Sequence, residues 1–221
     1  MKVIELHKSV TESNDRDADA LRALLKEKKV FLINLMSSAG SGKTTLLSRT
    51  IRDIGKEVRI AVLEADIDAQ VDAERIEALG ARSIQVHTDG MCHMDAGMTR
   101  TGLLEMGLED IDLAFLENIG NLTCPAEYDT GAVKKVMILS VPEGDDKPLK
   151  YPLMFQESDA LVVSKIDAMP WFDFDMNKLK ERVYRLNPDI RIFPVSAKTG
   201  EGMDAWEDWL KQETKTWTEE V

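Results

Sequence analysis

The stretch SSAGSGKTT at residues 37–45 constrains the fold of this chain more than any other feature. It follows a short, almost continuous apolar run at 30–36, which is typical of a strand buried on both faces, and a helical pattern begins at about Lys43. A strand, a glycine-rich turn, Lys-Thr and a helix form the context of a phosphate-binding loop. The alternative is a Gly/Ser turn that precedes a lysine by chance, and the flanking elements favour the phosphate loop.

Each residue type in this loop has a physical task. Gly40 and Gly42 allow a tight turn that directs backbone N–H groups inward, and the N-terminus of the helix adds its positive dipole end. Lys43 is expected to reach the β- and γ-phosphates, and the Thr44 hydroxyl is expected to ligate Mg²⁺. The predicted nucleotide-binding residues of the loop are Ala39, Gly40, Ser41, Gly42, Lys43, Thr44 and Thr45.

The rest of the chain alternates strand-like and helical segments, which predicts an α/β fold: a P-loop NTPase with a mainly parallel sheet and helices on both faces. A helix is expected at 13–28, with Ser13 or Asn14 as its N-cap. The strand candidates are 58–65, 83–87, 113–117, 133–141, 160–164 and 191–195, and the other helical segments are 69–80, 93–107, 175–187 and 203–217.

The length of 221 residues suits one domain, so we expect residues 1–221 to form a single nucleotide-binding domain with 1–28 as an N-terminal helical extension. The long polar segments 118–131 and 142–157 read as loops, and loops of this length in a compact domain are usually functional.

Charge and hydropathy exclude several classes of partner. The formal net charge of −12 argues against nucleic acid and against anionic membranes as partners. No apolar run approaches the roughly 18 residues of a membrane span, and the N-terminal stretch lacks an apolar signal core. These features predict a cytoplasmic protein, in which the two cysteines, Cys92 and Cys124, are expected to be reduced.

Two later segments predict that the nucleotide base is guanine. Residues 164–167, Ser-Lys-Ile-Asp, follow a strand at the place where GTPases usually carry Asn-Lys-x-Asp. Asp167 is expected to accept from two guanine donors that adenine does not offer together, and the stem of Lys165 to stack on the purine. The accompanying turn that faces the guanine carbonyl is predicted at Ser196, Ala197 and Lys198. Ser164 replaces the usual Asn, which should weaken the site or loosen its selectivity without inverting it; ATP is the alternative nucleotide.

Acidic residues at two strand ends are candidates for sensing the γ-phosphate and Mg²⁺. Glu117 and Gly120 have the spacing of an acid-x-x-Gly sensor, in which the Gly120 N–H meets the γ-phosphate and Glu117 acts through Mg²⁺ or its water. Asp66 and Asp68 follow another strand, and one of them is a candidate metal-side or water-positioning carboxylate. The alternative is a solvated acidic strand end in an acidic chain.

A second site is indicated by Cys92, His93 and Cys124. Thiolate and imidazole are good ligands for Zn²⁺ and Ni²⁺. Cys124 lies four residues after Gly120, so a loop that moves with the γ-phosphate would move this ligand too. Three ligands leave a tetrahedral site incomplete, and a symmetric dimer could complete it. The alternative is a pair of inert packed cysteines and a surface histidine.

Together these motifs resemble the hydrogenase nickel-incorporation GTPases, the HypB family. The resemblance covers about residues 30–210 and rests on NLMSSAGSGKTTLL, DAERIEALGA, CHMDA, FLENIGNLTCPAEYDTG, EGDDKPLKYPLMF, SKIDAMPW and SAKTGEGMDAWEDWL. It implies a dimerising P-loop GTPase of the SIMIBI type that hydrolyses GTP slowly to GDP and phosphate. It also implies nickel delivery to the large subunit of [NiFe] hydrogenase, together with a nickel-delivery partner protein.

The resemblance also implies roles for individual residues. Asp66 matches the switch carboxylate, and Lys147 or Lys150 matches a lysine that approaches the nucleotide of the partner chain in a homodimer. Cys92, His93 and Cys124 match the ligands of Ni²⁺ or Zn²⁺ at the dimer interface. The implied catalytic residues are Lys43, Asp66, Glu117 and Gly120, and the implied Mg²⁺ residues are Thr44, Asp66 and Glu117.

The chain departs from the family pattern at Met91, Gly97 and Ser164, whereas Ser37, in place of the first glycine of the phosphate-loop pattern, fits it. It contains only three histidines and neither a Cys-rich nor a His-rich nickel motif near its N-terminus, which predicts a switch or delivery factor instead of a nickel reservoir.

Three other functions stay open from the sequence. They are a nickel chaperone for another enzyme, such as carbon monoxide dehydrogenase or urease; a small-molecule kinase; and a metal-free GTP-regulated interaction protein. The apolar run at 168–172 is either core packing under the base loop or a partner or dimer surface.

Overall fold

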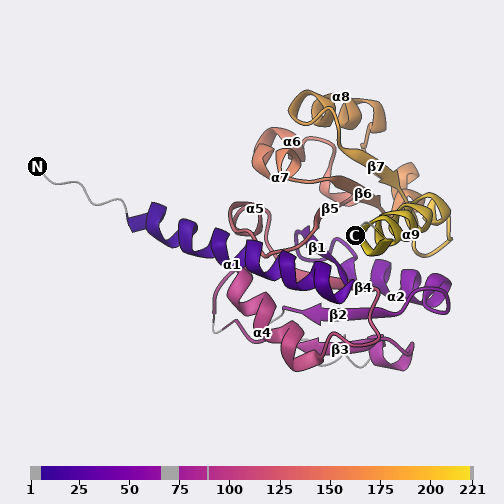
Figure 1. Ribbon diagram of the computed structural model, residues 1–221. Helices are drawn as coiled ribbons and strands as arrows, with labels where there is room; N and C mark the ends of the chain where they lie inside the picture. The colour runs from indigo at the N-terminus through magenta and orange to yellow at the C-terminus, as the bar shows by residue number, and fades with distance from the viewer. Residues whose placement is uncertain (1–5, 66–74, 89, 220–221) are drawn as a thin grey trace, which may run out of the picture.

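Residues 6–65, 75–88 and 90–219 are described by a computed structural model. Figure 1 shows a central sheet with helices on both faces. Seven strands, all paired in parallel, lie in the order β3-β2-β4-β1-β5-β6-β7. They are β1 Phe31–Ser37, β2 Ile60–Glu64, β3 Arg82–Gln85, β4 Leu113–Gly120, β5 Lys134–Ser140, β6 Ala160–Ser164 and β7 Arg191–Pro194. The predicted fold class, a parallel α/β sheet, is confirmed.

The helices lie before β1 (α1), in the connections between the strands, and after β7 (α9). They are α1 Leu6–Lys28, α2 Lys43–Ile54, α4 Ala96–Met106, α5 Cys124–Glu127, α6 Lys147–Lys150, α7 Pro152–Gln156, α8 Met176–Leu186 and α9 Met203–Glu219, with 3₁₀ turns η1 Val141–Glu143 and η2 Ile166–Trp171. Among the residues that the structure describes, no helix is both long and apolar enough to cross a membrane.

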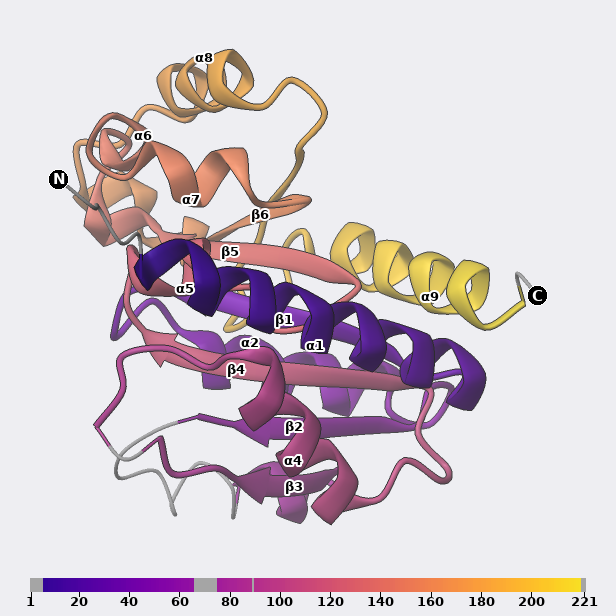
Figure 2. The same ribbon diagram turned by 60° about the vertical axis from the view of Figure 1, so that its left-hand side comes forward.

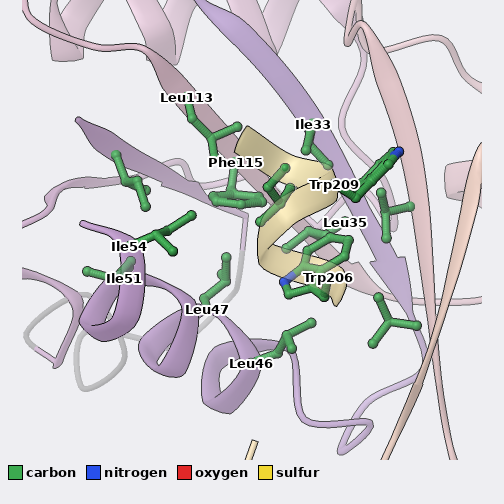
Figure 3. Packing of buried hydrophobic residues seen from close by; sticks show 14 of the residues in the cluster. Ile33, Leu35, Leu46, Leu47, Ile51, Ile54, Leu113, Phe115, Trp206 and Trp209 are labelled. Carbon is green, nitrogen blue, oxygen red and sulfur yellow. The ribbon is translucent and has the colours of Figure 1, made fainter. Parts of the chain in front are cut away.

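The sheet is buried on both faces, which explains why its strands read as continuous apolar runs. On one face, Phe31, Ile33 and Leu35 of β1 pack with α2 and with Trp206 and Trp209 of α9, as Figure 3 shows for most of these side chains. On the other face, α1 and α4 cover β1, β2 and β4, while α7 and α8 cover β5 and β6. Figure 2 shows α1 and α4 lying across this second face.

Most of the predicted boundaries differ from the structure by a few residues, and four differences matter for the site or the fold. Helix α1 begins at Leu6, so Ser13 and Asn14 lie inside it and the predicted N-cap is wrong; no Gly or Pro interrupts the helix upstream of them. The strand predicted at 113–117 continues to Gly120. The two long loops contain the short helices α5, α6 and α7. The predicted helix at 69–80 is seen at 75–78, and residues 69–74 lie outside the described residues.

The strand order brings the phosphate loop, the sensor segment and the base motif to one edge of the sheet. After β1 the chain continues to β2 and β3 on one side, returns to β4 beside β1, and then crosses to β5 on the other side. The carboxyl ends of the strands flanking such a reversal form the usual ligand-binding crevice of an open α/β sheet. The phosphate loop follows β1, the Glu117–Gly120 segment ends β4, and the base motif begins at the end of β6.

One buried carboxyl on the α2–α9 face makes the stability of the fold depend on pH. Burial, and then the charge of Asp53, raise the pKa of Glu207 to about 7 from an ordinary 4.5. The folded chain therefore holds this proton to a higher pH than the unfolded chain. Stability is lost as the pH rises through the interval between these two values.

We expect Glu207→Gln to remove this loss, because the amide is neutral at every pH. At pH 8 the variant should melt about 2–4 °C above the wild type, the change that about 1 kcal/mol produces in a domain of this size. At pH 4.5 the two proteins should differ much less. Thermal unfolding followed by circular dichroism across this range measures the difference, with Glu213→Gln on the same helix as the control. An equal difference at both pH values would contradict the assignment.

Candidate functional site

A cleft of about 570 Å³ opens at the carboxyl edge of the sheet. It contains three cationic side chains and two carboxylates, and its floor is the phosphate loop. The lining residues are Ala39, Gly40, Gly42, Lys43, Thr44, Thr45, Glu64, Ala65, Arg75, Glu117, Asn118, Ile119, Gly120 and Lys165. The volume lies within the range of small-molecule pockets.

The phosphate loop has the backbone geometry that its glycines predict. Gly40 and Gly42 have φ values of +74° and +99°, in the left-handed region where a side chain is strained. Helix α2 begins at Lys43 directly after this turn and has no side-chain cap at its N-terminus. Its first backbone N–H groups and its positive dipole end are thus directed at the cleft.

Ser37 has a clear task in place of the glycine of the usual pattern. Its backbone does not lie in the left-handed region, so no glycine is needed there. Its hydroxyl accepts hydrogen bonds from Lys43 Nζ at 2.8 Å and from Ser41 Oγ at 2.6 Å. The hydroxyl also donates to the Ser38 carbonyl at 2.8 Å. Ser37 therefore fixes where the lysine amine enters the loop.

The predicted sensor residues lie against the phosphate loop. Thr44 Oγ1 donates to Glu117 Oε1 at 3.1 Å, so the two described members of the predicted Mg²⁺ set are adjacent. Hydroxyl and carboxylate oxygens are the ligands that Mg²⁺ prefers, and Thr44 and Glu117 fit such an ion. Gly120 is paired with Ser37 across β4 and β1. A Cβ atom on Gly120 would lie 2.8 Å from the Ala39 nitrogen, so only glycine fits this close approach.

The two segments of the predicted base site meet each other and the phosphate loop. Ser196 Oγ donates to Asp167 Oδ1 at 2.7 Å, which fixes the carboxylate that is expected to read guanine. Lys165 has a φ of +59°, and its Nζ donates to the Gly40 carbonyl at 2.7 Å. Ser164 Oγ donates to the Ser41 carbonyl at 2.7 Å. Ser164 therefore ties the base motif to the phosphate loop, although a serine is too short to reach the base as well.

The remaining predicted nucleotide residues lie outside the cleft lining. Ala197 and Lys198 follow Ser196 in the turn after β7. Lys150 lies on α6, where its Nζ is 2.6 Å from Asp146 Oδ2 and its side chain is largely exposed. Lys150 does not line the cleft of its own chain. This position is compatible with the expected role, in which the lysine approaches the nucleotide of a partner chain. Asp66 and Asp68 lie outside the described residues.

The three predicted metal ligands come together although they lie on two segments of the chain. The Sγ atoms of Cys92 and Cys124 are 2.9 Å apart, and Cys92 Sγ is 3.8 Å from His93 Nδ1. One ligand atom from each residue lies within 4.8 Å of the other two. Two thiolates on a tetrahedral metal stand about 3.8 Å apart, which follows from metal–sulfur bonds of about 2.3 Å, so a bound metal separates the two sulfurs slightly.

The surroundings of these ligands suit a borderline metal ion. Burial lowers the pKa of His93, against the opposing charges of Asp95 and Glu127, so the imidazole is neutral and has a free lone pair near pH 7. Its ring stacks on Tyr128 at a centroid distance of 3.8 Å, which holds its orientation. Two thiols and one imidazole fit Ni²⁺ or Zn²⁺ better than they fit hard cations.

Helix α1 holds the two ligand-bearing segments together. The Asn14 side chain accepts from the Ala96 N–H at 3.0 Å and donates to the Asp129 carbonyl at 2.8 Å. Ala96 starts α4 just after the Cys92–His93 pair, and Asp129 follows the helix that begins with Cys124. Asn14 thus connects the two halves of the candidate metal site. The sequence-based prediction that Asn14 caps a helix does not include this role.

Sequence reasoning also missed two charged residues of the cleft. Glu64 ends β2, is buried, and is paired in register with Glu117 of β4. Arg75 lines the cleft. In the sequence it is the single basic residue of the stretch 63–79, which is rich in Asp and Glu. The sequence signals that could have identified them are an acidic residue at the end of a strand, for Glu64, and a basic residue within an acidic segment, for Arg75.

We expect Gly120→Ala to weaken binding of a nucleoside triphosphate by about tenfold or more, equivalent to about 1.4 kcal/mol. The added methyl group meets backbone atoms of Ala39, so the sensor and the phosphate loop must move apart. Titration with a fluorescent triphosphate analogue measures the change. Gly97→Ala is the matched control, because its Cβ would meet only the Asp95 carboxylate, at 3.4 Å. Wild-type affinity in Gly120→Ala would contradict the proposed close contact.

Comparisons with known proteins agree with this geometry. Residues 31–194 match the family model described as CobW/HypB/UreG, nucleotide-binding domain. The hydrogenase maturation factor HypB of Azotobacter chroococcum is 43% identical over 212 residues, which cover 96% of this chain and 70% of that protein. The protein of the same name from Escherichia coli K12 is 43% identical over 210 residues, covering 95% and 72%.

Solved structures show the same relationship. The crystal structure of HypB from Helicobacter pylori in complex with nickel matches with a TM-score of 0.87 and 36% identity, covering 92% of this chain and 96% of that one. A signal recognition particle receptor, FtsY, at 15% identity and a TM-score of 0.55, shares the fold alone. The phosphate loop, the Glu117–Gly120 segment and the base motif, which carry part of the expected resemblance, lie at one edge of the sheet, and the chain belongs to the CobW/HypB/UreG family, among the HypB hydrogenase maturation factors.

Proposed function

We propose that this chain is a GTP-hydrolysing nickel metallochaperone that assists nickel insertion into the large subunit of [NiFe] hydrogenase. One observation carries the proposal. Three soft and borderline donors meet within 4.8 Å, and one of them, Cys124, lies four residues beyond the sensor glycine of a nucleotide cleft. The name of the Helicobacter pylori relative, a HypB in complex with nickel, supports nickel as the cargo.

The phosphate side of the mechanism follows from the cleft. Lys43 and the N–H groups at the start of α2 neutralise the phosphates, and the Gly120 N–H faces the γ-phosphate. Thr44 and Glu117, with Asp66 from the segment outside the described residues, are the residues that would hold Mg²⁺. That ion supplies charge stabilisation on the β- and γ-phosphate oxygens when bound. Glu117 and Asp66 are also the candidates for orienting the attacking water.

The base side selects guanine. Asp167 is oriented by Ser196, so its second oxygen and its remaining lone pairs are available for the N1–H and the amino group of guanine. Adenine presents no matching pair of donors, and a carboxylate that the base covers without supplying them is left with costly unmet hydrogen bonds. We propose that the backbone of Ser196, Ala197 and Lys198 faces the guanine carbonyl. The short Ser164 removes one base contact, so we propose GTP affinity below that of a GTPase with asparagine there.

Nickel is the substrate of the second site. Cys92 and His93 precede α4, while Cys124 belongs to the segment that leaves the sensor, so a change of the sensor alters the spacing of the ligands. Linkage is reciprocal: if the nucleotide changes the affinity for nickel by some factor, nickel changes the affinity for the nucleotide by the same factor. Zn²⁺ competes for the same donors, and availability and geometry decide between the two metals.

Native mass spectrometry tests the proposal most directly. The purified chain is measured with GDP and with a non-hydrolysable GTP analogue, each with and without Ni²⁺. We expect the nickel count to depend on the nucleotide. Cys124→Ala and His93→Ala should each lower nickel affinity by more than about tenfold, since even loss of an outer-shell partner costs 10–100-fold.

His87→Ala is the matched control, because His87 is exposed and lies outside the triad. It should keep wild-type nickel binding. Equal nickel affinity with GDP and with the analogue would remove the coupling on which the proposal depends. Nucleotide binding without any nickel binding would instead indicate a metal-free GTP-regulated interaction protein.

We also propose that the chain acts as a nucleotide-dependent homodimer. Trp171 and Phe172 at the end of η2 are 77% and 46% exposed, and Leu149 of α6 is 67% exposed. The turns η1 and η2 are in contact, and η1 leads directly to α6. Trp171 and Phe172 directly follow the base motif, and covering these apolar side chains with a second copy would remove them from water and bring its Lys147 or Lys150 toward the nucleotide.

We expect the double change Trp171→Ser and Phe172→Ser to raise the dimer Kd by about 30-fold or more. Loss of a central aromatic anchor typically costs at least about 2 kcal/mol. Sedimentation velocity with the GTP analogue measures the change. Leu104→Ser is the control, because Leu104 is 51% exposed on α4, away from the base loop. A monomer in every nucleotide state would overturn the proposed dimer.

A further inference from the structure

Two buried side-chain amides meet behind the phosphate loop. Asn34 of β1 is 0% exposed and Asn118 of β4 is 1% exposed. Asn118 Nδ2 donates to Asn34 Oδ1 at 3.1 Å. They lie on the sheet face that is otherwise lined by Leu32, Leu116 and the apolar side chains of α1 and α4. A polar pair in such a layer is costly unless its groups find partners, so its placement needs a physical reason.

The surrounding donors fix the orientation of both amides. Asn118 Oδ1 accepts from the Met94 N–H at 3.3 Å and from the Ile119 N–H at 2.9 Å. A backbone N–H can only donate, so the oxygen of Asn118 must face these two groups and its NH₂ must face Asn34. The Asn34 NH₂ is then left without a hydrogen-bond partner among the described residues. A buried donor without a partner lowers the free energy of unfolding by about 1–3 kcal/mol. Asn34 therefore orients Asn118 at the expense of stability.

These contacts join the nucleotide cleft to the metal site. Asn118 lines the cleft and lies between Glu117 and Gly120 on the sensor. The Met94 N–H that it holds belongs to the peptide unit formed with the carbonyl carbon of His93. One side chain therefore reaches from the residue next to the Mg²⁺ carboxylate to the peptide that carries a metal ligand. The covalent route through Cys124 is separate from this hydrogen-bonded one.

We infer that Asn118, oriented by Asn34, is a positioning residue that transmits the state of the γ-phosphate sensor to Cys92 and His93. The inference rests on the proposed function and deepens it. When the sensor shifts, Cys124 moves through the chain and the Cys92–His93 pair moves through the Asn118 hydrogen bond. Both halves of the donor set thus respond to the nucleotide, and without Asn118 only one half does.

Asn14 provides a matched comparison within the same site. Like Asn118, it accepts one hydrogen bond from a backbone N–H of the segment that follows His93, here that of Ala96, at 3.0 Å. It belongs to α1 and does not line the cleft. Loss of Asn14 should therefore loosen the ligands equally in every nucleotide state, whereas loss of Asn118 should remove the difference between states.

The experiment measures the nickel Kd of the full chain with GDP and with a non-hydrolysable GTP analogue, and compares the ratio of the two values. Couplings between sites are typically about 5–150-fold. Asn118→Ala is expected to bring the ratio at least threefold closer to one. Asn34→Ala keeps Asn118 but removes the acceptor that orients the Asn118 amide. It should also bring the ratio closer to one, by a smaller factor than Asn118→Ala does. Asn14→Ala should weaken nickel binding in both states and leave the ratio as in the wild type.

Hydrogen exchange of the peptide containing Met94 gives a second readout that needs no metal. The Met94 amide should exchange faster in Asn118→Ala and in Asn34→Ala than in the wild type, while Asn14→Ala should not accelerate it. A wild-type ratio in both Asn118→Ala and Asn34→Ala would overturn the inference, as would an equal collapse of the ratio in Asn14→Ala. A ratio of one in the wild type itself would instead refute the proposed function, so the two failures are distinguishable.

Discussion

The pairing of β4 with β1 is the constraint on which the rest of the site depends. Because β4 lies beside the strand that carries the phosphate loop, Glu117 reaches Thr44 and the Gly120 backbone packs against Ala39. The chain then leaves β4 and reaches Cys124 within four residues. The proposed metal ligand Cys124 is therefore tied to the nucleotide cleft by covalent chain length, before any side-chain contact is considered.

The parts of this site that sequence reasoning predicted are those with short, local patterns. The phosphate loop needs two glycines in the left-handed region followed by a helix, and both signals lie within six residues of Gly40. Burial of the sheet on both faces gives strands such as Phe31–Ser37 a continuous apolar run, which is why the strand positions were predicted well. The Cys92–His93 pair and Cys124 lie on two different segments, so their meeting depends on the strand order and not on a local pattern.

The parts that were missed depend on contacts between distant positions. Asn14 was expected to cap a helix because its own neighbourhood contains no sign of Ala96 or Asp129, which lie more than eighty residues away. Asn34 was hidden inside an apolar strand, and its partner Asn118 is 84 residues along the chain. The position of Asp66 stays a prediction, since it lies outside the described residues.

The extension of β4 to Gly120 makes movement of the sensor depend on backbone pairing with β1. A sensor in a free loop swings without breaking backbone hydrogen bonds, whereas one paired with Ser37 at the end of a strand must peel away from its neighbour. The pairing is irregular between Leu35 and Ser37, and each backbone hydrogen bond that is broken there costs roughly 0.5–1.5 kcal/mol net. Under the proposed function, the nucleotide has to supply free energy of this order to separate the sensor from β1, before the spacing of the three metal donors can change.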